Sequence, residues 1–413
     1  MGNRTVVILG GGVGGLVAAN ELRRLLPDKH RVVLVEKNAQ HAFAPSFLWL
    51  MVGDRTAEQV TRPVSHLLRC GVEFVHAEVK HIDLHKRRVE VDSQSLVYDY
   101  LIVALGAQMD FQAVPGLMDE AHTFYTLTAA ARLHSALQTF TGGTIAIVIA
   151  GTPYKCPGAP HKGAMLIEHL LRKKGVRGQA SVHLFTPEPQ PMPVAGPALG
   201  DAVKQMLNSR GIGFHTQHKL TSVDITNRRL LFEDRGAINY DLLITIPLHK
   251  GPALVREAGL ANESGWIPVD RYSLTTTYEN VYAIGDVTTV PIPGRWKPGV
   301  PLMLPKAGVF AHAQALTVAR RIVAEISGTR SALSFCGDGY CMLEAGKDMA
   351  GFAYGDFYAE PSPQIRLRQV GRIWHLGKVL FEQWWLAPFG PRRKLLETAI
   401  RAGAAIMRIP VSL

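Results

Sequence analysis

The sequence has few cysteines, no long apolar run and no low-complexity tract. Its four cysteines show neither the CxxC spacing of a metal site nor the density of a disulfide-stapled secreted domain. The longest apolar run, near residues 144–151, falls far short of the ~20 residues that a membrane-spanning helix needs. The N-terminus enters an apolar strand at Thr5 without space for a signal peptide. We therefore expect no metal site, no cleavable signal and only peripheral contact with any membrane.

Positive charge exceeds negative charge in this chain. Its 45 Lys and Arg against 34 Asp and Glu give a formal net charge of +11, which suits nucleic acid, an anionic membrane surface or an anionic substrate. The sequence contains no RNP, helix-turn-helix or zinc-finger pattern, so we expect no nucleic-acid partner. With 47% hydrophobic residues among 413, the chain can bury a large core and should divide into two or three domains.

The order of apolar segments predicts an α/β fold with a repeated unit. Residues 5–36 have the pattern of strand, glycine turn, helix and strand, and residues 144–185 repeat that order. Segments with strand-like alternation follow each unit, which predicts antiparallel accessory strands beside two parallel sheets. Short strands, an aromatic stretch and a basic, Ala-rich tail make up the last ~90 residues and indicate a third, smaller unit.

A glycine-rich turn near the N-terminus predicts a dinucleotide site. Gly10, Gly12 and Gly15 fit G-x-G-x-x-G between strand and helix, where absent side chains allow a tight turn and bring backbone amides close to a pyrophosphate. Glu36 ends the next strand at the distance of about 20 residues at which a carboxylate accepts hydrogen bonds from ribose hydroxyls. The combination is much more specific than the glycines alone.

Two further motifs establish a family resemblance. LIVALGA (101–107) and VYAIGDVT (281–288) follow the glycine turn, and with it they resemble the pyridine-nucleotide-disulfide-oxidoreductase superfamily over residues 4–330. The resemblance implies that Asp286 hydrogen-bonds the ribityl chain of FAD and that Gly106 lets the backbone pass close to the cofactor. An ordinary turn aspartate is the alternative reading of Asp286.

The resemblance also implies the fold and its division. We expect two Rossmann-like domains arranged as in glutathione reductase, a small C-terminal domain and amphipathic tail helices. We expect the first part of the FAD domain at residues 1–110 and a second Rossmann-like domain with a degenerate NAD site at 111–265. The chain should then return to the FAD domain at 266–328 and end in the C-terminal domain at 329–413.

The second unit lacks the glycine turn that an NAD(P)H site requires. Its first strand is followed by residues 152–157, TPYKCP, in place of G-x-G-x-x-G. Two prolines remove amide donors, while Tyr154 and Lys155 occupy positions where backbone should approach phosphate. We therefore expect that NAD(P)H is not the reductant.

The replacement segment resembles a narrower group of enzymes. TPYKCPGAPHK is similar to the segment that carries one redox cysteine in sulfide:quinone oxidoreductases and in the flavoprotein subunit of flavocytochrome c sulfide dehydrogenase, with Cys156 at the matching position. Those enzymes carry a partner cysteine in a C-terminal strand, which implies Cys341 in GYCMLEAG, with Cys336 as a rival. An inert core thiol is the alternative for both, and we expect Cys70 to be a core residue.

Other features of the resemblance concern the flavin. LPKAGVFAHAQA (304–315) is similar to a PKxGVFAExQA stretch of the same group, and Lys306 could favour an anionic reduced flavin or a bound quinone oxygen; a solvated lysine at a helix start is the alternative. No cysteine lies between Gly106 and Gly143, where many of these enzymes have a third, so a two-cysteine mechanism is implied. HAFAPSFLWL (41–50) has no cysteine for covalent attachment, so we expect non-covalent FAD.

The C-terminal tail has the pattern of amphipathic helices. In LGKVLFEQWWL (376–386), tryptophans 384 and 385 lie on one broad apolar face, which suits a membrane interface. Residues 392–408 place apolar residues on one side and basic residues on another: Leu396, Ala399, Ile400, Gly403 and Met407 against Lys394, Arg401 and Arg408. Packing against the body or a second subunit is the alternative, which leaves a homo-oligomer possible.

These features predict a peripheral-membrane, sulfide:quinone oxidoreductase-like enzyme at a prokaryotic-type cell membrane. Hydrosulfide would attack a Cys156–Cys341 disulfide, one sulfur would keep the sulfane, and FAD would pass two electrons to a quinone. Three alternatives stay open: an NADH:quinone oxidoreductase-like enzyme, a flavoprotein that reduces a cytochrome, and a non-catalytic redox-sensing flavoprotein.

Overall fold

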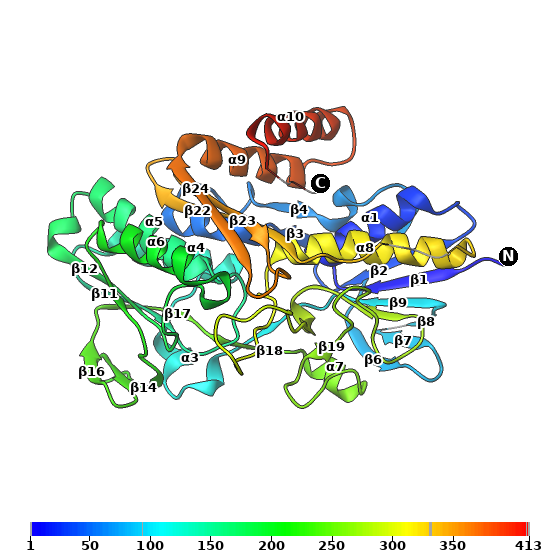
Figure 1. Cartoon of the computed structure of the whole chain (residues 1–413). Coiled ribbons are helices and arrows are strands. Elements are labelled where there is room, and N and C mark those ends of the chain that lie inside the picture. Colours follow the sequence, from blue (N-terminus) through cyan, green and yellow to red (C-terminus); the bar gives the residue numbers. More distant parts are fainter. Residues whose placement is uncertain (1, 93, 330–332, 410, 412–413) are drawn as a thin grey trace.

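The N-terminal part of the chain forms a parallel sheet. A computed structural model describes residues 2–92, 94–329, 333–409 and 411, and its first sheet has the order β20-β9-β1-β2-β5 (Figure 1). Strands β1, β2, β9 and β20 are largely buried, which explains their near-continuous apolar sequences, whereas the edge strand β5 is partly exposed. Their bounds are β1 Thr5–Leu9, β2 Arg31–Glu36, β5 Val72–His76, β9 Tyr100–Val103 and β20 Val281–Ala283.

Helices cover one face of this sheet and an antiparallel meander covers the other. Alternate strand residues explain the division, because Ile8 packs with α1 and α8 whereas its neighbour Leu9 packs with β6, β7 and β8. The covering elements are α1 Val13–Leu25, α8 Gly308–Ile326, β6 Val79–Asp83, β7 Arg88–Val91 and β8 Gln94–Val97.

A second parallel sheet, of order β13-β12-β11-β17, repeats this design. Ile147 packs with α4, α5 and α6, whereas Val148 packs with the meander β14-β15-β16. The elements are β11 Gly143–Ile149, β12 Ala180–Phe185, β13 Ile212–His215, β17 Leu242–Ile246, β14 Leu220–Asp224, β15 Arg229–Phe232, β16 Gly236–Asn239, α4 Leu127–Thr139, α5 Ala159–Lys173 and α6 Pro197–Asn208.

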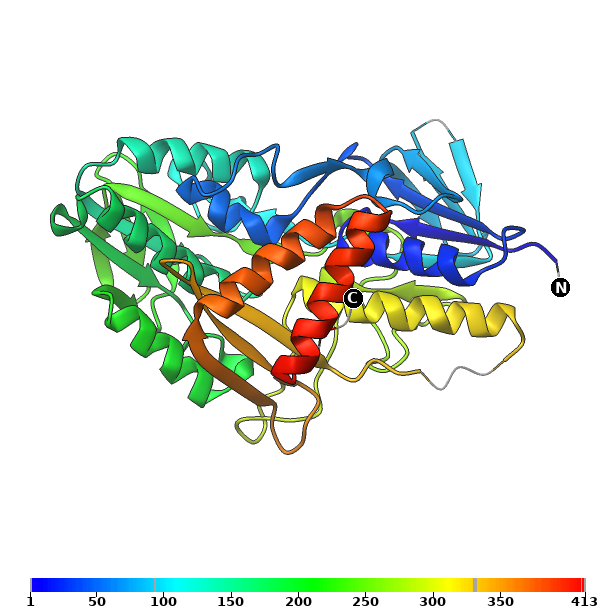
Figure 2. The ribbon, with the colours of Figure 1, turned by 90° about the horizontal axis from the view of Figure 1, so that it is seen from above.

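The C-terminal unit is a three-stranded antiparallel sheet followed by two helices. The sheet bridges the two parallel sheets, because β22 contacts both α5 and α8. Helices α9 and α10 form the outermost layer above it (Figures 1 and 2). The bounds are β22 Asp338–Gly346, β23 Met349–Asp356, β24 Gln364–Gly371, α9 Arg372–Leu386 and α10 Pro391–Met407.

Shorter elements connect these units. They are β3 Gln40–Ala42, β4 Thr61–Pro63, β10 Gln108–Asp110, β18 Leu248–Lys250, β19 Ile267–Pro268, β21 Thr288–Thr289, α2 Phe47–Val52, α3 Leu117–Glu120 and α7 Ala253–Glu257. The predicted α/β class, with two parallel sheets, accessory meanders and two tail helices, is confirmed.

The structure corrects two expectations about exposure. Trp384 and Trp385, expected at a membrane interface, are only 4% exposed and belong to the core beneath α9. The reason is that α8 and the β3 region pack against that face of α9; His41 accepts a hydrogen bond from Trp385 Nε1 at 2.9 Å. Cys70, expected in the core, is exposed. Among the described residues, no helix is long and apolar enough to cross a bilayer.

Candidate active site

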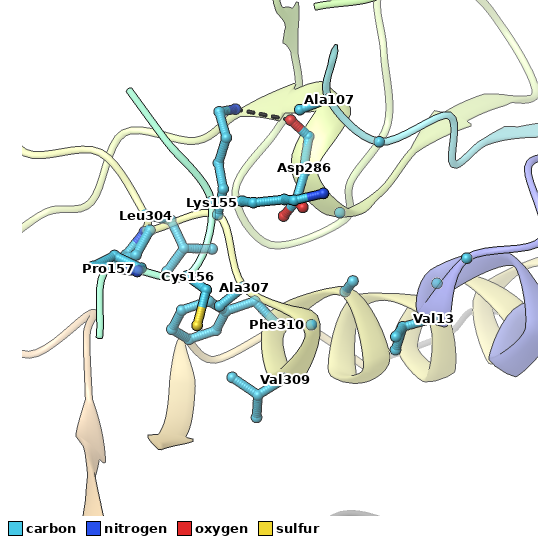
Figure 3. Close-up of a pocket in the computed structure, with 18 of the residues that line it drawn as sticks. Val13, Ala107, Lys155, Cys156, Pro157, Asp286, Leu304, Ala307, Val309 and Phe310 are labelled. Carbon is cyan, nitrogen blue, oxygen red and sulfur yellow. Dashed lines mark hydrogen bonds between the residues drawn. The ribbon is translucent and has the colours of Figure 1, made fainter. Parts of the chain in front are cut away.

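A large cavity is lined by residues from all three parts of the molecule. Its volume is about 1450 Å³, and residues from the turn after β1, the turn after β11, the start of α8 and the strand β22 line it. Figure 3 shows Lys155, Cys156 and Asp286 around this space, with Val309 and Phe310 of α8 beside them. All nine residues predicted for the site except Gly15 line this cavity.

The N-terminal glycine turn has the geometry that its spacing predicts. Gly10 has φ +101°, in the region open to glycine, and its N–H donates to Val35 O at 2.8 Å. A Cβ built on Gly15 would lie 1.8 Å from Gly10 O, so only glycine allows α1 to pack so closely on the turn. A Cβ on Gly12 meets no protein atom within 4 Å and points into open space. The turn therefore suits a pyrophosphate in the cavity.

Glu36 is held at the edge of the same turn. One carboxylate oxygen accepts from Gly11 N–H at 2.6 Å, and the other accepts from the backbone and side-chain N–H groups of Asn38 at 2.8 and 2.7 Å. This orients the carboxylate at the end of β2, where it lines the cavity. Sequence reasoning did not identify Asn38, although its position two residues after the acidic residue was a usable signal.

The loop after β20 brings Asp286 to the middle of the cavity. Burial raises the pKa of the Asp286 carboxyl, while the charges of Lys155 and Lys306 oppose that change. Gly106, at the end of β9, has φ +67°, and a Cβ there would meet no protein atom within 4 Å. Both residues leave space for a ligand that passes along the sheet edge, as an FAD ribityl chain would.

Lys306 is a half-buried lysine that braces this loop. Its ammonium donates to the carbonyl oxygens of Asp286 at 2.8 Å and Thr288 at 2.9 Å, and it lies 3.3 Å from the centroid of the Trp266 ring. Burial lowers the pKa of Lys306 to about 8, although Asp286 opposes the shift. The reading of Lys306 as a solvated helix-start lysine is thereby wrong. Its influence on a flavin stays a prediction.

The structure brings together two cysteines from distant parts of the chain. Cys156 lies in the turn between β11 and α5 with φ +55°, and its N–H donates to Lys306 O at 2.6 Å. Cys341 lies on β22 opposite Ala353 of β23. Both thiols are half-buried, and Lys162 Nζ is 3.7 Å from Cys156 Sγ and 3.8 Å from Cys341 Sγ. Burial raises the pKa of the Cys341 thiol, against the effect of the Lys162 charge.

The other two cysteines lie elsewhere. Cys70 and Cys336 are both exposed, and neither lines the cavity. Cys336 Sγ lies 3.4 Å from Ser334 O, as a weak donor to that carbonyl. The position next to Cys156 is thus held by Cys341 and not by its rival Cys336.

The turn after β11 brings a tyrosine against an acidic residue that follows β12. Tyr154 is 5% exposed, and its hydroxyl donates to Glu188 at 2.8 Å. Glu188 follows β12, where Rossmann enzymes present a carboxylate to the ribose of NAD. Burial raises the pKa of Glu188, and hydrogen bonds from Tyr154 and Thr186 oppose this. The hydroxyl of Tyr154 therefore already hydrogen-bonds the carboxylate that the ribose of a nucleotide would need.

Sequence reasoning missed a buried ionic cluster behind the cysteines. Glu344 of β22, 1% exposed, lies 3.0 Å from His375 Nδ1 and 3.6 Å from Lys378 Nζ of α9. The glutamate hydrogen bond raises the pKa of His375. Lys162 is the fourth member of this cluster through its charge interaction with Glu344. The available signal was a lysine among the mostly apolar residues that follow Cys156.

Comparison with known proteins agrees with this geometry. The model of the pyridine nucleotide-disulphide oxidoreductase family matches residues 4–315. The sulfide-quinone reductase of Aquifex aeolicus (strain VF5) is 27% identical over 394 residues, which cover 92% of this chain and 90% of that protein. The mitochondrial sulfide:quinone oxidoreductase of Mus musculus is 27% identical over 376 residues, which cover 86% and 79% of the two chains. The solved structure of the A. aeolicus sulfide:quinone oxidoreductase has a TM-score of 0.83 at 26% identity, covering 92% of this chain and 90% of that one.

Proposed function

The chain belongs to the pyridine nucleotide-disulphide oxidoreductase family, and on that premise we propose that it oxidises sulfide to sulfane sulfur and reduces a quinone. The predicted resemblance to sulfide:quinone oxidoreductases is confirmed, and the chain is an FAD-dependent oxidoreductase. The observation that carries the substrate assignment is that Cys156 and Cys341 both lie beside Lys162, in the same cavity that Gly10 and Gly12 line.

The proposed reaction divides into thiol exchange and electron transfer. Hydrosulfide attacks a Cys156–Cys341 disulfide, so that a bond forms between the substrate sulfur and one cysteine. The bond between the cysteines breaks, and its electron pair leaves on the other sulfur as a thiolate. Bound FAD supplies the two-electron chemistry that links this thiolate to the quinone. The sum balances as hydrosulfide, one proton and quinone giving sulfane sulfur and quinol.

The residues present fit FAD bound without a covalent link. Gly10, Gly12, Glu36 and Asp286 all line one cavity, and they are the residue types that suit the pyrophosphate, ribose and ribityl groups of FAD. The cysteines on the cavity wall are Cys156 and Cys341, which the proposal assigns to sulfur chemistry. Acid precipitation should therefore release the flavin.

The function is tested by anaerobic titration of the purified flavoprotein with sulfide. We expect one equivalent of sulfide per flavin to bleach the absorbance of the oxidised flavin. Any sulfide whose sulfur stays bound to the cysteine pair is needed in addition. Decylubiquinone added afterwards should restore the oxidised spectrum. A flavin that dithionite reduces but excess sulfide leaves oxidised would contradict the proposal.

NADH and NADPH at millimolar concentration should leave the flavin oxidised. The reason is that the Tyr154 hydroxyl hydrogen-bonds Glu188 and that prolines 153 and 157 remove amide donors from the turn after β11. Stopped-flow absorbance near 450 nm, with dithionite as the positive control, measures this. Bleaching that saturates at micromolar NADH would support the alternative NADH:quinone oxidoreductase instead.

We propose further that α9 and α10 bind an anionic membrane surface, through residues other than the predicted ones. Leu396 and Ile400 pack on the core, and Met407 packs near Trp374. The exposed side presents a different set of apolar residues, flanked by Arg392, Lys394, Arg401 and Arg408. These apolar residues are Ile373 (51% exposed), Leu376 (51%), Leu395 (71%) and Ile406 (80%).

Replacing Leu395 and Ile406 together with glutamate should reduce the bound fraction on anionic vesicles about tenfold or more. Two buried side chains of this size contribute roughly 3 kcal/mol to membrane binding, and the new charges oppose anionic lipid. Vesicle co-sedimentation, with flavin content as a check on folding, measures the effect. Val97→Glu with Met118→Glu, at sites 58% and 65% exposed on other elements, is the matched control. Equal binding of both double variants would show that α10 does not contact lipid.

A further inference from the structure

Lys162 is a buried ammonium whose hydrogen-bond partners are the two reactive sulfurs. It lies in the first turns of α5 and is 6% exposed. Among the described residues, its side-chain hydrogen bonds go to Cys156 Sγ at 3.7 Å and Cys341 Sγ at 3.8 Å. Burying an ammonium is costly unless an opposite charge or strong acceptors compensate it. Neutral thiols are weak acceptors, whereas a thiolate compensates the charge directly.

The second buried lysine at this site has other partners. Lys378 Nζ lies 3.6 Å from Glu344 and 3.8 Å from the centroid of the Trp49 ring. Glu344 also accepts from His375. One carboxylate therefore faces Lys378 and His375 at close range, and it acts on Lys162 from further away. The sulfur atoms are the closest groups able to carry the charge that Lys162 requires.

The electrostatic environment keeps Lys162 charged. Burial acts to lower its pKa, but the charges on Cys156, Cys341 and Glu344 outweigh burial and raise the pKa above its ordinary value. These charges therefore favour the ammonium form of Lys162 beside the two sulfurs. It can donate hydrogen bonds to a thiolate without giving up a proton.

We propose that Lys162 is a catalytic residue that stabilises negative charge on either cysteine sulfur during thiol exchange. The inference rests on the proposed function. When hydrosulfide bonds to one cysteine and the bond between the cysteines breaks, the leaving electron pair settles on a sulfur within 4 Å of the Lys162 ammonium. Because Lys162 is similarly close to both sulfurs, it can follow the charge from one to the other without moving its backbone. The ammonium acts there as an oxyanion-hole donor acts on oxygen.

The test measures thiol ionisation separately from turnover. Lys162→Met removes the charge at similar length, Lys162→Arg retains it, and Lys173→Met on the exposed side of the same helix is the control. All three are made in the flavin-loaded Cys70→Ser/Cys336→Ser protein, so that Cys156 and Cys341 are the cysteines left. Iodoacetamide modification of each is followed by peptide mass spectrometry across pH after reduction with dithiothreitol.

Lys162→Met should raise the pH midpoint of alkylation of Cys156, Cys341 or both by about one to two units. The sign follows because an adjacent positive charge favours the thiolate, so its loss moves ionisation to higher pH. Lys162→Arg, which keeps the charge, should hold the alkylation midpoints close to the wild-type values, and Lys173→Met should leave them unchanged. The other ionisable groups that face the sulfurs stay the same in every variant: Tyr125, Tyr154, Glu188, Glu344 and Lys378.

Sulfide-dependent flavin reduction should also fall about 100-fold in Lys162→Met, with reduction by dithionite unchanged. Unchanged alkylation midpoints in a folded, flavin-loaded Lys162→Met protein overturn the proposal, whatever its activity. If methionine is not tolerated, Lys162→Gln carries the same test with a neutral donor. If sulfide does not reduce the flavin of the wild-type protein, but Lys162→Met still raises the alkylation midpoint, the proposed substrate is refuted and the contact between Lys162 and a thiolate is supported.

Discussion

Cys156→Ser and Cys341→Ser should each lower the rate of flavin reduction by sulfide on the order of 10⁴-fold. Two thiols that exchange one disulfide act as a unit, so the loss of either removes the whole relay. Both sulfurs contact one ammonium, which is why we expect similar losses from the two variants. Anaerobic stopped-flow absorbance measures the rate, and flavin content checks that the cavity is intact.

Cys70→Ser and Cys336→Ser are the matched controls for this prediction. Both residues are exposed and lie outside the cavity, so each variant should retain most of the wild-type rate. Loss of activity in Cys336→Ser together with full activity in Cys341→Ser would show that the wrong partner had been assigned to Cys156.

The two reactive cysteines should also differ in spectrum. We predict that Cys156 faces the flavin and Cys341 carries the sulfane, because Cys156 lies in the turn where a nicotinamide would meet the flavin in nucleotide-dependent relatives. Reduced Cys341→Ser should keep a long-wavelength thiolate-to-flavin absorption band, and Cys156→Ser should lack it. The reverse pattern would exchange the two roles.

Gly12→Ala should lower FAD affinity by roughly 100-fold, equivalent to about 2.7 kcal/mol, with little effect on the fold of the apoprotein. A Cβ at Gly12 meets no protein atom within 4 Å, but it projects into the cavity where amides must approach a pyrophosphate. Gly15→Ala should lose FAD and also destabilise the apoprotein, since its Cβ would lie 1.8 Å from Gly10 O.

Fluorescence titration of apoprotein with FAD and thermal unfolding of the apoprotein separate these two effects. Gly178→Ala is the control, because its Cβ also meets no atom within 4 Å and it lies outside the cavity. Wild-type FAD affinity in Gly12→Ala would place the pyrophosphate elsewhere.

Much of the flavin site was predictable because its signals are local. The glycine turn, the acidic residue after the second strand and the Gly-Asp turn after β20 each depend on a few neighbouring residues whose backbone geometry fixes their chemistry. The same holds for the missing glycines after β11. Strand identities followed from apolar runs, since strands buried on both faces have no polar alternation.

The contacts that give the site its charge could not be predicted in this way. Periodicity showed that the tail helices have an apolar face, but it did not show which element covers that face, so Trp384 and Trp385 were expected at a surface and are buried. Similarly, Tyr154 meets Glu188 because β11 and β12 pair in parallel, which brings the segments after the two strands to the same edge of the sheet.

The sequence by itself determined the two-sheet α/β class, the flavin turn and the absence of a second glycine turn, because these depend on residues adjacent in the chain. Tertiary structure alone decided that Lys162 lies beside Cys156 and Cys341 and that Lys378 lies beside Glu344. These pairings depend on how β22 and α9 pack against α5, and burial then makes each unpaired charge expensive enough to require a partner.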